Sequence, residues 1–267
     1  MSKNKEYVIS NIIFNKKDIV LKYIDEGEEK EISLFPSVYS EFYLYVGKTL
    51  LSDELKEIKA ANKSAKYFDI AYKLVSRKEY SSLLLKRKLK EKGVPEEYLH
   101  KIIKALKEQH LLDDERYALD YKDALDIKLY GKNYIIKALK EAGIKDEFIF
   151  TIEFVNEEEK INKLMPQLIK KRSKESYLLM KQHLYQDLFL RGYESELINQ
   201  VLETLQKDDE EKEVEKCLLD YQKYYRIYKG KYDKKELTSR IITSLMRKGH
   251  SYGIIKKVME ENEDEWN

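Results

Sequence analysis

The sequence predicts a mainly α-helical protein of tandem three-helix repeats forming an elongated, curved array, with a small N-terminal β-strand module. Three observations predict this fold. Gly and Pro are scarce, at 9 and 3 of 267 residues, while 37% of the residues are charged, a composition that favours helices. An apolar fraction of 42%, with 22 Tyr and 8 Phe, is sufficient for a sizeable core. A helical pattern recurs after residue 64, which is typical of repeat architectures.

The first 35 residues differ from the rest, because β-branched and aromatic residues gather in short runs separated by turn formers. We expect strands at Tyr7–Phe14, Asp18–Ile24 and Lys30–Phe35, assembled as a small meander. A short helix over Val38–Val46 should follow and end at Gly47, since helices often end at a glycine.

Four glycines organise the remaining chain, with apolar residues four and eight positions before each and five, six and nine positions after each. This pattern predicts two amphipathic helices joined by a tight turn, in which the glycine caps the first helix. The glycines are Gly93, Gly143, Gly192 and Gly249, spaced 50, 49 and 57 residues apart.

A further helix precedes each pair, so that each repeat contains three helices. Ser52 is the expected N-cap of the helix that leads into the first repeat. The four leading helices are expected at Ser64–Val75, Asp114–Leu129, Glu157–Lys171 and Asp209–Tyr228. The predicted division is 1–50 for the strand module and short helix, then 51–110, 111–156, 157–206 and 207–267 for the repeats, the last with an acidic tail.

Charge is segregated along the chain although the net charge is only +2. The segments Arg77–Lys107 and Lys229–Lys257 have net charges of +6 and +7, whereas Glu203–Glu215 has −5. Basic segments of this kind suit an acidic partner or nucleic acid, and a solvated lysine-rich helix face is the alternative. The acidic stretch from residue 206 to 211 is expected to be an exposed connection or a frayed helix start.

Residues 77–118, RKEYSSLLLKRKLKEKGVPEEYLHKIIKALKEQHLLDDERYA, and residues 130–143, YGKNYIIKALKEAG, resemble the RecX regulatory protein family. The strand module resembles the extension of its long Gram-positive members. The chain departs from the family at residues 77–81, where RKEYS replaces the common arginine-serine-glutamate start, so the helix start there is expected to shift. The third and fourth repeats match the family only by their pattern.

The resemblance implies a cytoplasmic, non-catalytic modulator of the RecA recombinase. Such a protein would bind RecA or its filament on single-stranded DNA and restrain strand exchange and ATP hydrolysis in recombination and DNA repair. We expect no cofactor, no metal, no membrane partner and a monomer; whether single- or double-stranded DNA is bound directly stays open.

Basic residues are the candidates for contacting the partner or DNA phosphates. They fall in three groups, one in the first repeat and two in the later repeats: Arg77, Lys86, Arg87, Lys90, Lys101 and Lys104; Lys170, Lys171 and Arg172; and Arg247 and Lys248.

Other residues that could carry chemistry have structural interpretations. Asp113 and Asp114 are expected to cap a helix rather than to bind metal or transfer protons. Cys217 is expected to be a small core residue. Four tyrosines could stack on bases, but their spacing favours packing between helices; they are Tyr221, Tyr224, Tyr225 and Tyr228. Histidines 100, 110, 183 and 250 have no partner at ligand spacing and are expected to be incidental.

Two alternatives to a recombinase regulator remain. One is a helical nucleic-acid-binding protein that acts without RecA, because three-helix units can place a basic helix on DNA. The other is a small-molecule enzyme, which would require a deep polar pocket. No glycine-rich phosphate-binding loop is present in the sequence, so nucleotide binding has no support.

Overall fold

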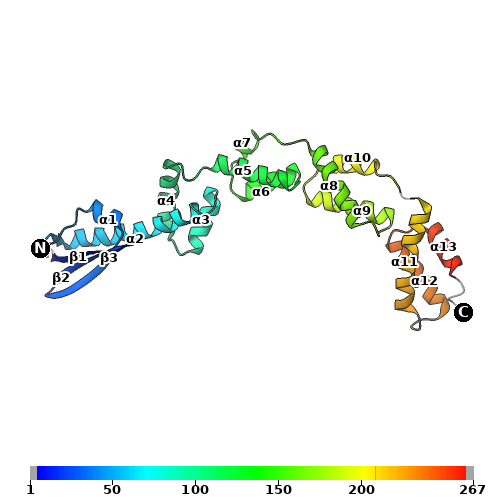
Figure 1. Ribbon diagram of the computed structural model, residues 1–267, viewed down its shortest axis with the longest axis horizontal. Helices are drawn as coiled ribbons and strands as arrows, with labels where there is room; N and C mark the ends of the chain where they lie inside the picture. Colours follow the sequence, from blue (N-terminus) through cyan, green and yellow to red (C-terminus); the bar gives the residue numbers. More distant parts are fainter. Residues whose placement is uncertain (1–4, 208, 263–267) are drawn as a thin grey trace. The chain divides into compact units, whose positions relative to one another are not determined.

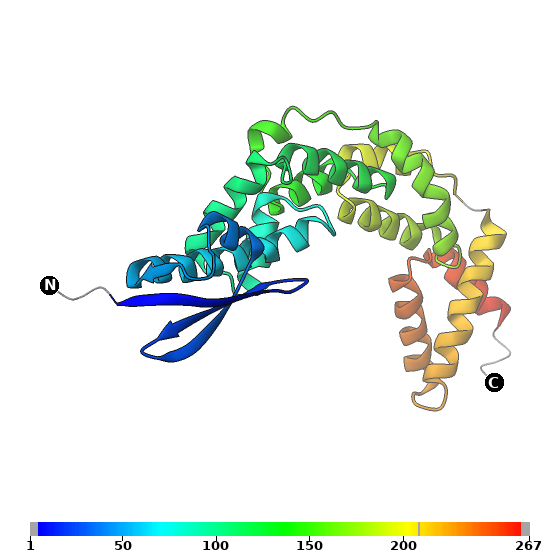
Figure 2. The ribbon, with the colours of Figure 1, turned by 60° about the vertical axis from the view of Figure 1, so that its left-hand side comes forward.

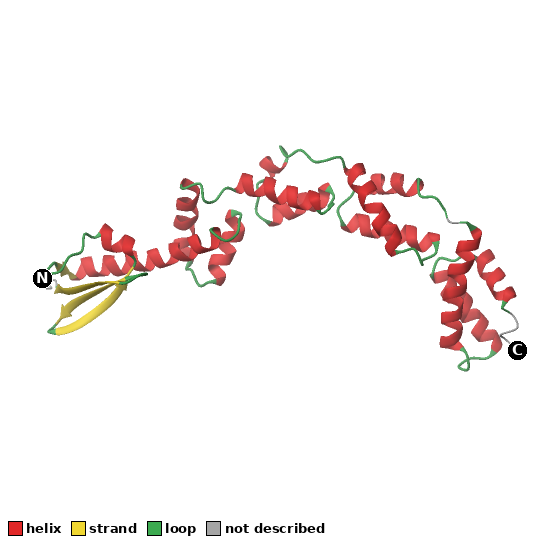
Figure 3. Cartoon of the chain, viewed as in Figure 1, coloured by secondary structure: helices red, strands yellow, loops and turns green. Residues whose placement is uncertain are grey.

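The computed structural model describes residues 5–207 and 209–262 and is mainly helical with a small N-terminal sheet, as the sequence predicts (Figure 1, Figure 3). Two compact units make up the chain. Unit 1 comprises Met1–Ala118 and Ala142–Ile144, and unit 2 comprises Leu119–Glu141 and Lys145–Asn267. Asp208 and the end of the predicted acidic tail lie outside the described residues.

The N-terminal sheet is antiparallel and has the strand order β3-β2-β1-β4. Strands β1 (Glu6–Phe14), β2 (Ile19–Asp25) and β3 (Glu28–Leu34) form the predicted meander. A fourth strand, β4 (Thr49–Leu51), pairs with β1 and was not predicted. Three residues are too few to show an alternating pattern, so this strand exists through its pairing with β1 rather than through local sequence.

One face of the sheet packs on the long helix α2 (Ser52–Val75), which Figure 2 shows beside the strands. Ile9 and Leu21 from the sheet form a core with Leu55 and Ile58 from α2, and all four are buried. Because the sheet side of α2 is apolar at helical spacing, the strand module is anchored on the same helix that begins the repeats.

Two helix boundaries in this region were predicted wrongly. Helix α1 is shorter than expected, spanning Pro36–Glu41, and the chain leaves the helix before Tyr43, which adopts a left-handed φ of 46°. Ser52 is not an N-cap: it is the first residue of α2, Leu51 occupies the cap position, and no side-chain hydrogen bond caps this end. The pairing of β4 with β1 keeps Leu51 extended, which explains the position of the helix start.

Four helix triplets follow along the chain, and in each the predicted glycine ends the second helix with φ between 77° and 87°. The C-cap interpretation of these glycines is confirmed. The triplets are α2, α3 (Ser82–Glu91) and α4 (Glu96–Glu108); α5 (Asp114–Ile127), α6 (Lys132–Glu141) and α7 (Asp146–Ile149); α8 (Glu157–Lys171), α9 (Tyr177–Leu190) and α10 (Ser195–Glu203); and α11 (Glu210–Tyr228), α12 (Lys234–Arg247) and α13 (Tyr252–Glu261).

Helix α7 is the exception among the third helices, because it has only four residues. The apolar spacing predicted a helix that would include Ile152, yet the helix stops at Ile149. The residues that follow, TIEFV at 151–155, are rich in β-branched and aromatic side chains, which lose rotamer freedom in a helix. Ile152 is still buried, although it lies outside the helix.

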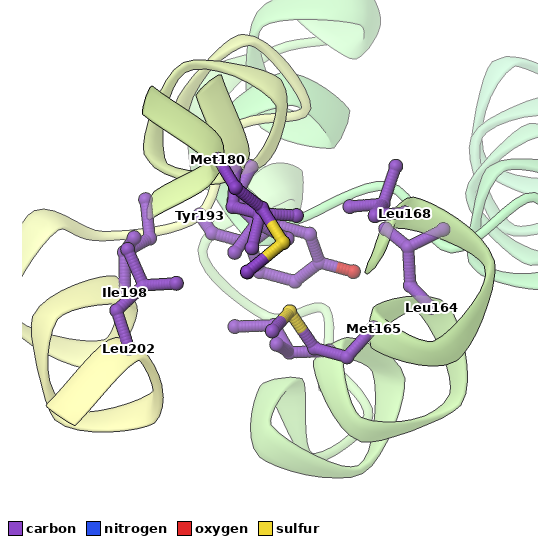
Figure 4. Close-up of a cluster of buried hydrophobic side chains, with 10 residues drawn as sticks. Leu164, Met165, Leu168, Met180, Tyr193, Ile198 and Leu202 are labelled. Carbon is purple, nitrogen blue, oxygen red and sulfur yellow. The ribbon is translucent and has the colours of Figure 1, made fainter. Parts of the chain in front are cut away.

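The third triplet shows how a unit of this size builds its core. Buried residues from α8 and α10 face Met180 of α9 and Tyr193 of the α9–α10 turn (Figure 4). The hydroxyl of Tyr193 donates to the Leu129 carbonyl at 2.9 Å, which satisfies the polar end of a buried ring. Burial raises the pKa of Tyr193 to about 12.

In the fourth triplet the tyrosines pack between helices, as their spacing predicted. Tyr221 and Tyr225 are buried and their rings stack at 5.9 Å. Tyr224 and Tyr228 are partly buried against the same core, which also contains Ile241. The packing interpretation of these tyrosines is therefore confirmed.

Successive triplets are connected by a recurring contact, here called a joint, between the start of the second helix of one triplet and the glycine turn of the next. In the first joint Ser81 Oγ donates to the Ala142 carbonyl at 2.5 Å, and in the third joint Ser176 Oγ donates to the Lys248 carbonyl at 2.6 Å. In the second joint a backbone group replaces the hydroxyl, and Gly131 N donates to the Arg191 carbonyl at 2.8 Å. The acceptor always directly precedes a turn glycine.

A carboxylate completes each joint by capping the second helix from the neighbouring triplet. Ser82 N donates to Asp114 at 2.6 Å, and Lys132 N donates to Glu157 at 2.7 Å. The third joint has the same bond, from Tyr177 N to Glu213 at 3.1 Å. The carboxylate satisfies an otherwise unpaired N–H and lies at the positive end of a helix dipole, so it stabilises the helix start and the contact together.

The joint explains why three of the turns require glycine for a second reason besides their positive φ. A Cβ on Gly143 would lie 2.6 Å from Leu83 Cβ, and one on Gly249 would lie 2.7 Å from Ser176 Oγ. A Cβ on Gly192 would overlap the backbone of Tyr134. Gly93 has no such neighbour within 4 Å, because no triplet precedes its own.

The joints predict that the same substitution destabilises the protein much more at Gly192 than at Gly93. Asn tolerates a left-handed conformation, so Gly93→Asn should cost less than about 1 kcal/mol. Gly192→Asn should cost about 3 kcal/mol, because its side chain must displace the Tyr134 backbone and break the second joint. Urea denaturation followed by circular dichroism measures both, and equal losses for the two variants would contradict the joint as the cause.

Candidate functional site

Helix α3 carries three of the six candidate basic residues of unit 1: Lys86, Arg87 and Lys90. Ser81 begins the helix by accepting the Leu84 N–H at 3.2 Å, and Leu85 and Leu89 are buried in the core. Arg87 and Lys90 are exposed and Lys86 is partly buried. The buried leucines thus hold the helix so that its basic side remains at the surface.

Helix α4 packs on α3 and presents Lys101 and Lys104, both exposed, while Arg77 is exposed in the turn after α2. Some of these charges are already paired. Lys90 lies 2.6 Å from Glu96, and Lys104 lies 3.8 Å from Glu108.

Within the part of the chain that the structure describes, four of the unit 1 candidates have no carboxylate partner within 4 Å. They are Arg77, Lys86, Arg87 and Lys101. These are the charges most available to a partner.

The candidates at the end of α8 in unit 2 differ from one another. Lys170 and Lys171 are exposed in the last turn, where they meet the negative end of the helix dipole. Arg172 is instead partly buried and its guanidinium binds Asp187 at 2.7 Å and Glu175 at 3.1 Å. Although burial opposes its charge, these carboxylates raise the pKa of Arg172. The charge of Arg172 is therefore paired with carboxylates within unit 2.

The last pair of candidates lies at the end of α12. Arg247 is exposed, and Lys248 is partly buried at the C-cap. The Lys248 carbonyl accepts the Ser176 hydroxyl in the third joint, and Ser176 closely follows the end of α8 in sequence. The third joint therefore connects the segment that follows α8 to the end of α12.

The sequence predicted that Asp113 and Asp114 both cap the helix that follows them, but only Asp113 does so. Asp113 accepts the backbone N–H groups of Glu115 and Arg116, so its capping role is confirmed. Asp114 does not cap its own helix: it accepts Ser82 N and Ser82 Oγ from α3 and binds Lys107 at 2.6 Å. Local sequence could not reveal this, because Ser82 is distant along the chain.

Cys217 and two histidines are part of the structure of unit 2. Cys217 is fully buried in the fourth core, and burial raises its pKa to about 12, so its core assignment is confirmed. Two of the four histidines have carboxylate partners that the sequence did not reveal. His183 lies 2.8 Å from Glu175, and buried His250 lies 3.0 Å from Asp220.

One open cavity of about 450 Å³ lies beside α1 and α2 in unit 1, with apolar walls that include Val38 and Phe68. Its two carboxylates are Glu41 and Asp69, and Asp69 is paired with Lys73 at 2.6 Å. Over residues 5–207 and 209–262, no group of three His, Cys, Asp or Glu side chains is placed to hold a metal ion. In the same residues no helix is sufficiently long and apolar to span a membrane.

The fold and these surfaces define a helical-repeat protein whose three-helix triplets expose basic side chains. Comparison with known proteins identifies the family that it resembles. Residues 210–259 match the family model described as the third three-helix domain of RecX.

Two relatives named "Regulatory protein RecX" match most of the chain. The protein from Staphylococcus saprophyticus is 26% identical over 246 residues, which cover 90% of this chain and 89% of the relative. The protein from Listeria welshimeri is 28% identical over 261 residues, covering 96% and 97%. A solved structure described as the crystal structure of regulatory protein RecX is 19% identical, with a TM-score of 0.48, and the match covers 95% of this chain and 99% of that one.

The family model and the two relatives confirm the resemblance to the RecX regulatory protein family, and the chain is similar to these relatives over nine-tenths of its length. The family-model match lies in the fourth triplet, which resembles the family only by pattern when the sequence is read alone. The relatives are named as regulatory proteins, which supports a regulatory role.

Asp114 gives the first joint a predicted pH dependence. Burial by itself raises the pKa of Asp114, but its bonds with Lys107 and Ser82 outweigh burial, so that the net shift is downward from 3.8. A carboxyl with a lowered folded-state pKa contributes stability above its unfolded pKa and loses it as the pH falls through the folded value. Asp114→Asn should therefore be less stable than the unsubstituted protein at pH 7, and the difference should shrink below about pH 4.

Urea denaturation at pH 7, 5 and 3 measures this difference, with Glu115→Gln, an exposed residue one position later, as the matched control. A difference that stays constant over this range would show that the charge of Asp114 is not what stabilises the joint.

Proposed function

We propose that this chain binds the RecA recombinase or its filament on single-stranded DNA and restrains strand exchange and ATP hydrolysis, without catalysing a reaction itself. The proposal rests on the similarity to proteins named as RecX regulators. It places the protein in the cytoplasm, as a monomer without a cofactor. The repeat boundaries at residues 50, 110, 156 and 206 stay a prediction.

The unit 1 basic surface, formed by Arg77, Lys86, Arg87 and Lys101, is the observation that carries the contact with the filament. Lys86, Arg87 and Lys101 lie on the packed helices α3 and α4, Arg77 lies in the turn after α2, and none of the four has a carboxylate partner among the described residues. Unpaired basic groups on a rigid scaffold attract phosphates or acidic side chains without first breaking internal ion pairs. Lys90 and Lys104 add to this surface when a partner competes with Glu96 and Glu108.

A second candidate function is DNA binding that is independent of RecA. Among the described residues, Lys170, Lys171 and Arg247 have no carboxylate partner, and they favour this function because they give unit 2 exposed basic groups of its own. The two functions differ in what determines specificity. Binding to DNA phosphates alone weakens steeply with salt and does not depend on the recombinase.

The proposal predicts that the purified protein lowers ATP hydrolysis by RecA on single-stranded DNA at no more than about one copy per RecA. Hydrolysis is followed at about 50 and 200 mM salt with ATP in excess. Inhibition that survives an excess of competing DNA supports binding to the filament. Inhibition that excess DNA abolishes supports the second function, and no inhibition at any ratio removes the first.

Charge reversal tests the unit 1 basic surface. The triple variant Lys86→Glu, Arg87→Glu and Lys90→Glu should weaken inhibition about tenfold or more, because three favourable charges become unfavourable. The matched control reverses three exposed lysines of α2 in the same unit: Lys59, Lys63 and Lys66. Circular dichroism confirms that both variants are folded, and equal inhibition by both would exclude this surface as the contact.

A further inference from the structure

The first triplet has a glycine turn like those of the joints, and no other described part of the chain covers it. Gly143, Gly192 and Gly249 are each covered by the preceding triplet, whereas Gly93 has no atom within 4 Å of an added Cβ. Lys92 and Gly93 are exposed, and among the described residues the Lys92 carbonyl accepts no hydrogen bond. In the first and third joints the equivalent carbonyls, of Ala142 and Lys248, accept a serine hydroxyl.

The first triplet also has a residue that corresponds to the joint carboxylates, Asn62, and its side chain already accepts a hydrogen bond. Asn62 Oδ1 accepts Phe35 N at the start of α1, at 2.9 Å. Asn62 lies on the first helix of its triplet, as Asp114 does, and each precedes the end of its helix by about three and a half turns. The strand module thus uses one half of the joint surface and leaves the glycine turn uncovered.

We propose that the Gly93 turn, residues 92–94, is a docking surface for a helix corner of a partner protein, whose second helix begins with a Ser or Gly cap. This inference goes beyond the proposed function, because it specifies the partner's local structure. The three joints provide the argument: the same turn in this chain takes a Ser cap twice and a Gly once.

Lys92, the residue before Gly93, is expected to make a second contact, with the end of the partner helix that precedes the corner. In the second joint Arg191 Nη1 donates to the Lys128 carbonyl at 3.1 Å, just after the end of α5. Lys92 occupies the position of Arg191 in the first triplet, and its ammonium can donate to carbonyls in the same way. The partner therefore offers free carbonyls at the end of one helix and a small cap at the start of the next.

A second copy of this chain does not fit the turn. Ser81, Gly131 and Ser176 are already used in the internal joints. The N-cap of the second helix of the last triplet is Asp233, whose carboxylate accepts Glu236 N and has no proton to donate to a carbonyl. Its backbone N–H cannot take the place of that of Gly131, because a Cβ at Gly131 would lie only 2.5 Å from the Gly192 carbonyl oxygen. Among the described residues no second helix of this chain is therefore left with a free Ser or Gly cap, which favours a corner from a different protein over a second copy.

The chain itself provides a probe for this surface. A peptide copying Glu175–Leu190 contains the Ser176 cap and α9, and a lactam between Gln182→Lys and Gln186→Glu, both exposed positions, holds it helical. Added to the full-length protein, it should shift the amide resonances of Gly93 and Val94 saturably, with a Kd of about 1 mM or tighter. The same peptide with Ser176→Asp should bind at least about tenfold more weakly, since Asp cannot donate.

Variants of the chain test the location of binding. Gly93→Asn fits the open space and the positive φ, but its side chain covers the turn, so binding should fall at least about tenfold. Gly230→Asn is the matched control, because Gly230 also has φ of 77° and open space but lies in no joint. Thermal melts confirm that both variants fold.

Three results would overturn the proposal: no shift at Gly93 at several times the expected Kd, equal binding by the Ser176→Asp peptide, or binding unaffected by Gly93→Asn. None of these measurements involves RecA or DNA, so failure here leaves the proposed function standing, and failure of the ATPase test leaves this inference standing.

Discussion

The contact on which the repeat structure depends is the joint, in which a helix start makes one hydrogen bond to the glycine turn of the next triplet and another to a carboxylate on the first helix of that triplet. A three-helix unit of this size buries a small core and is marginal alone, so much of its stability comes from its neighbours. The bonds are short and buried, as at Ser81 and Ser176, where unpaired partners would be costly. Each triplet is thereby connected to the next by bonds in which one partner is a backbone group and the other, except at Gly131, is a side chain.

Charged side chains reinforce two joints from inside unit 2. Lys160 is buried and binds Asp126 and the Tyr130 carbonyl from the preceding triplet. Lys216 and Glu213 are both buried at 3.0 Å, and Glu213 also caps α9. Removing charges from water costs energy that a single ion pair rarely repays, so these pairs persist where further hydrogen bonds hold them. Such groups select one alignment of the triplets over a shifted one, since a shift would leave buried charges unpaired.

The repeat helices were predictable because their causes are local. Gly93 and its equivalents end helices wherever they occur, and Glu157–Lys171 was predicted at its observed bounds. Features that depend on distant residues were not predictable: β4 exists through β1, and Asp114 acts on a helix that precedes it. The candidate site shows the same division. Sequence located the basic segments, but it could not separate Arg172, which is held by Asp187, from the exposed Lys170 and Lys171.

That separation matters for recognition, because a local net charge measures attraction only when the charges are free to act. Ion pairs such as Lys90 with Glu96 cancel much of each other's field at a distance, and unpaired groups such as Arg87 and Lys101 do not. A partner that meets the first triplet therefore encounters two different kinds of surface. The unpaired bases attract over several ångströms with little directional preference, whereas the Gly93 turn offers a single carbonyl that a donor must reach at hydrogen-bond distance. Attraction by the bases speeds encounter, and geometry at the turn then discriminates between partners, which a field of lysines alone cannot do.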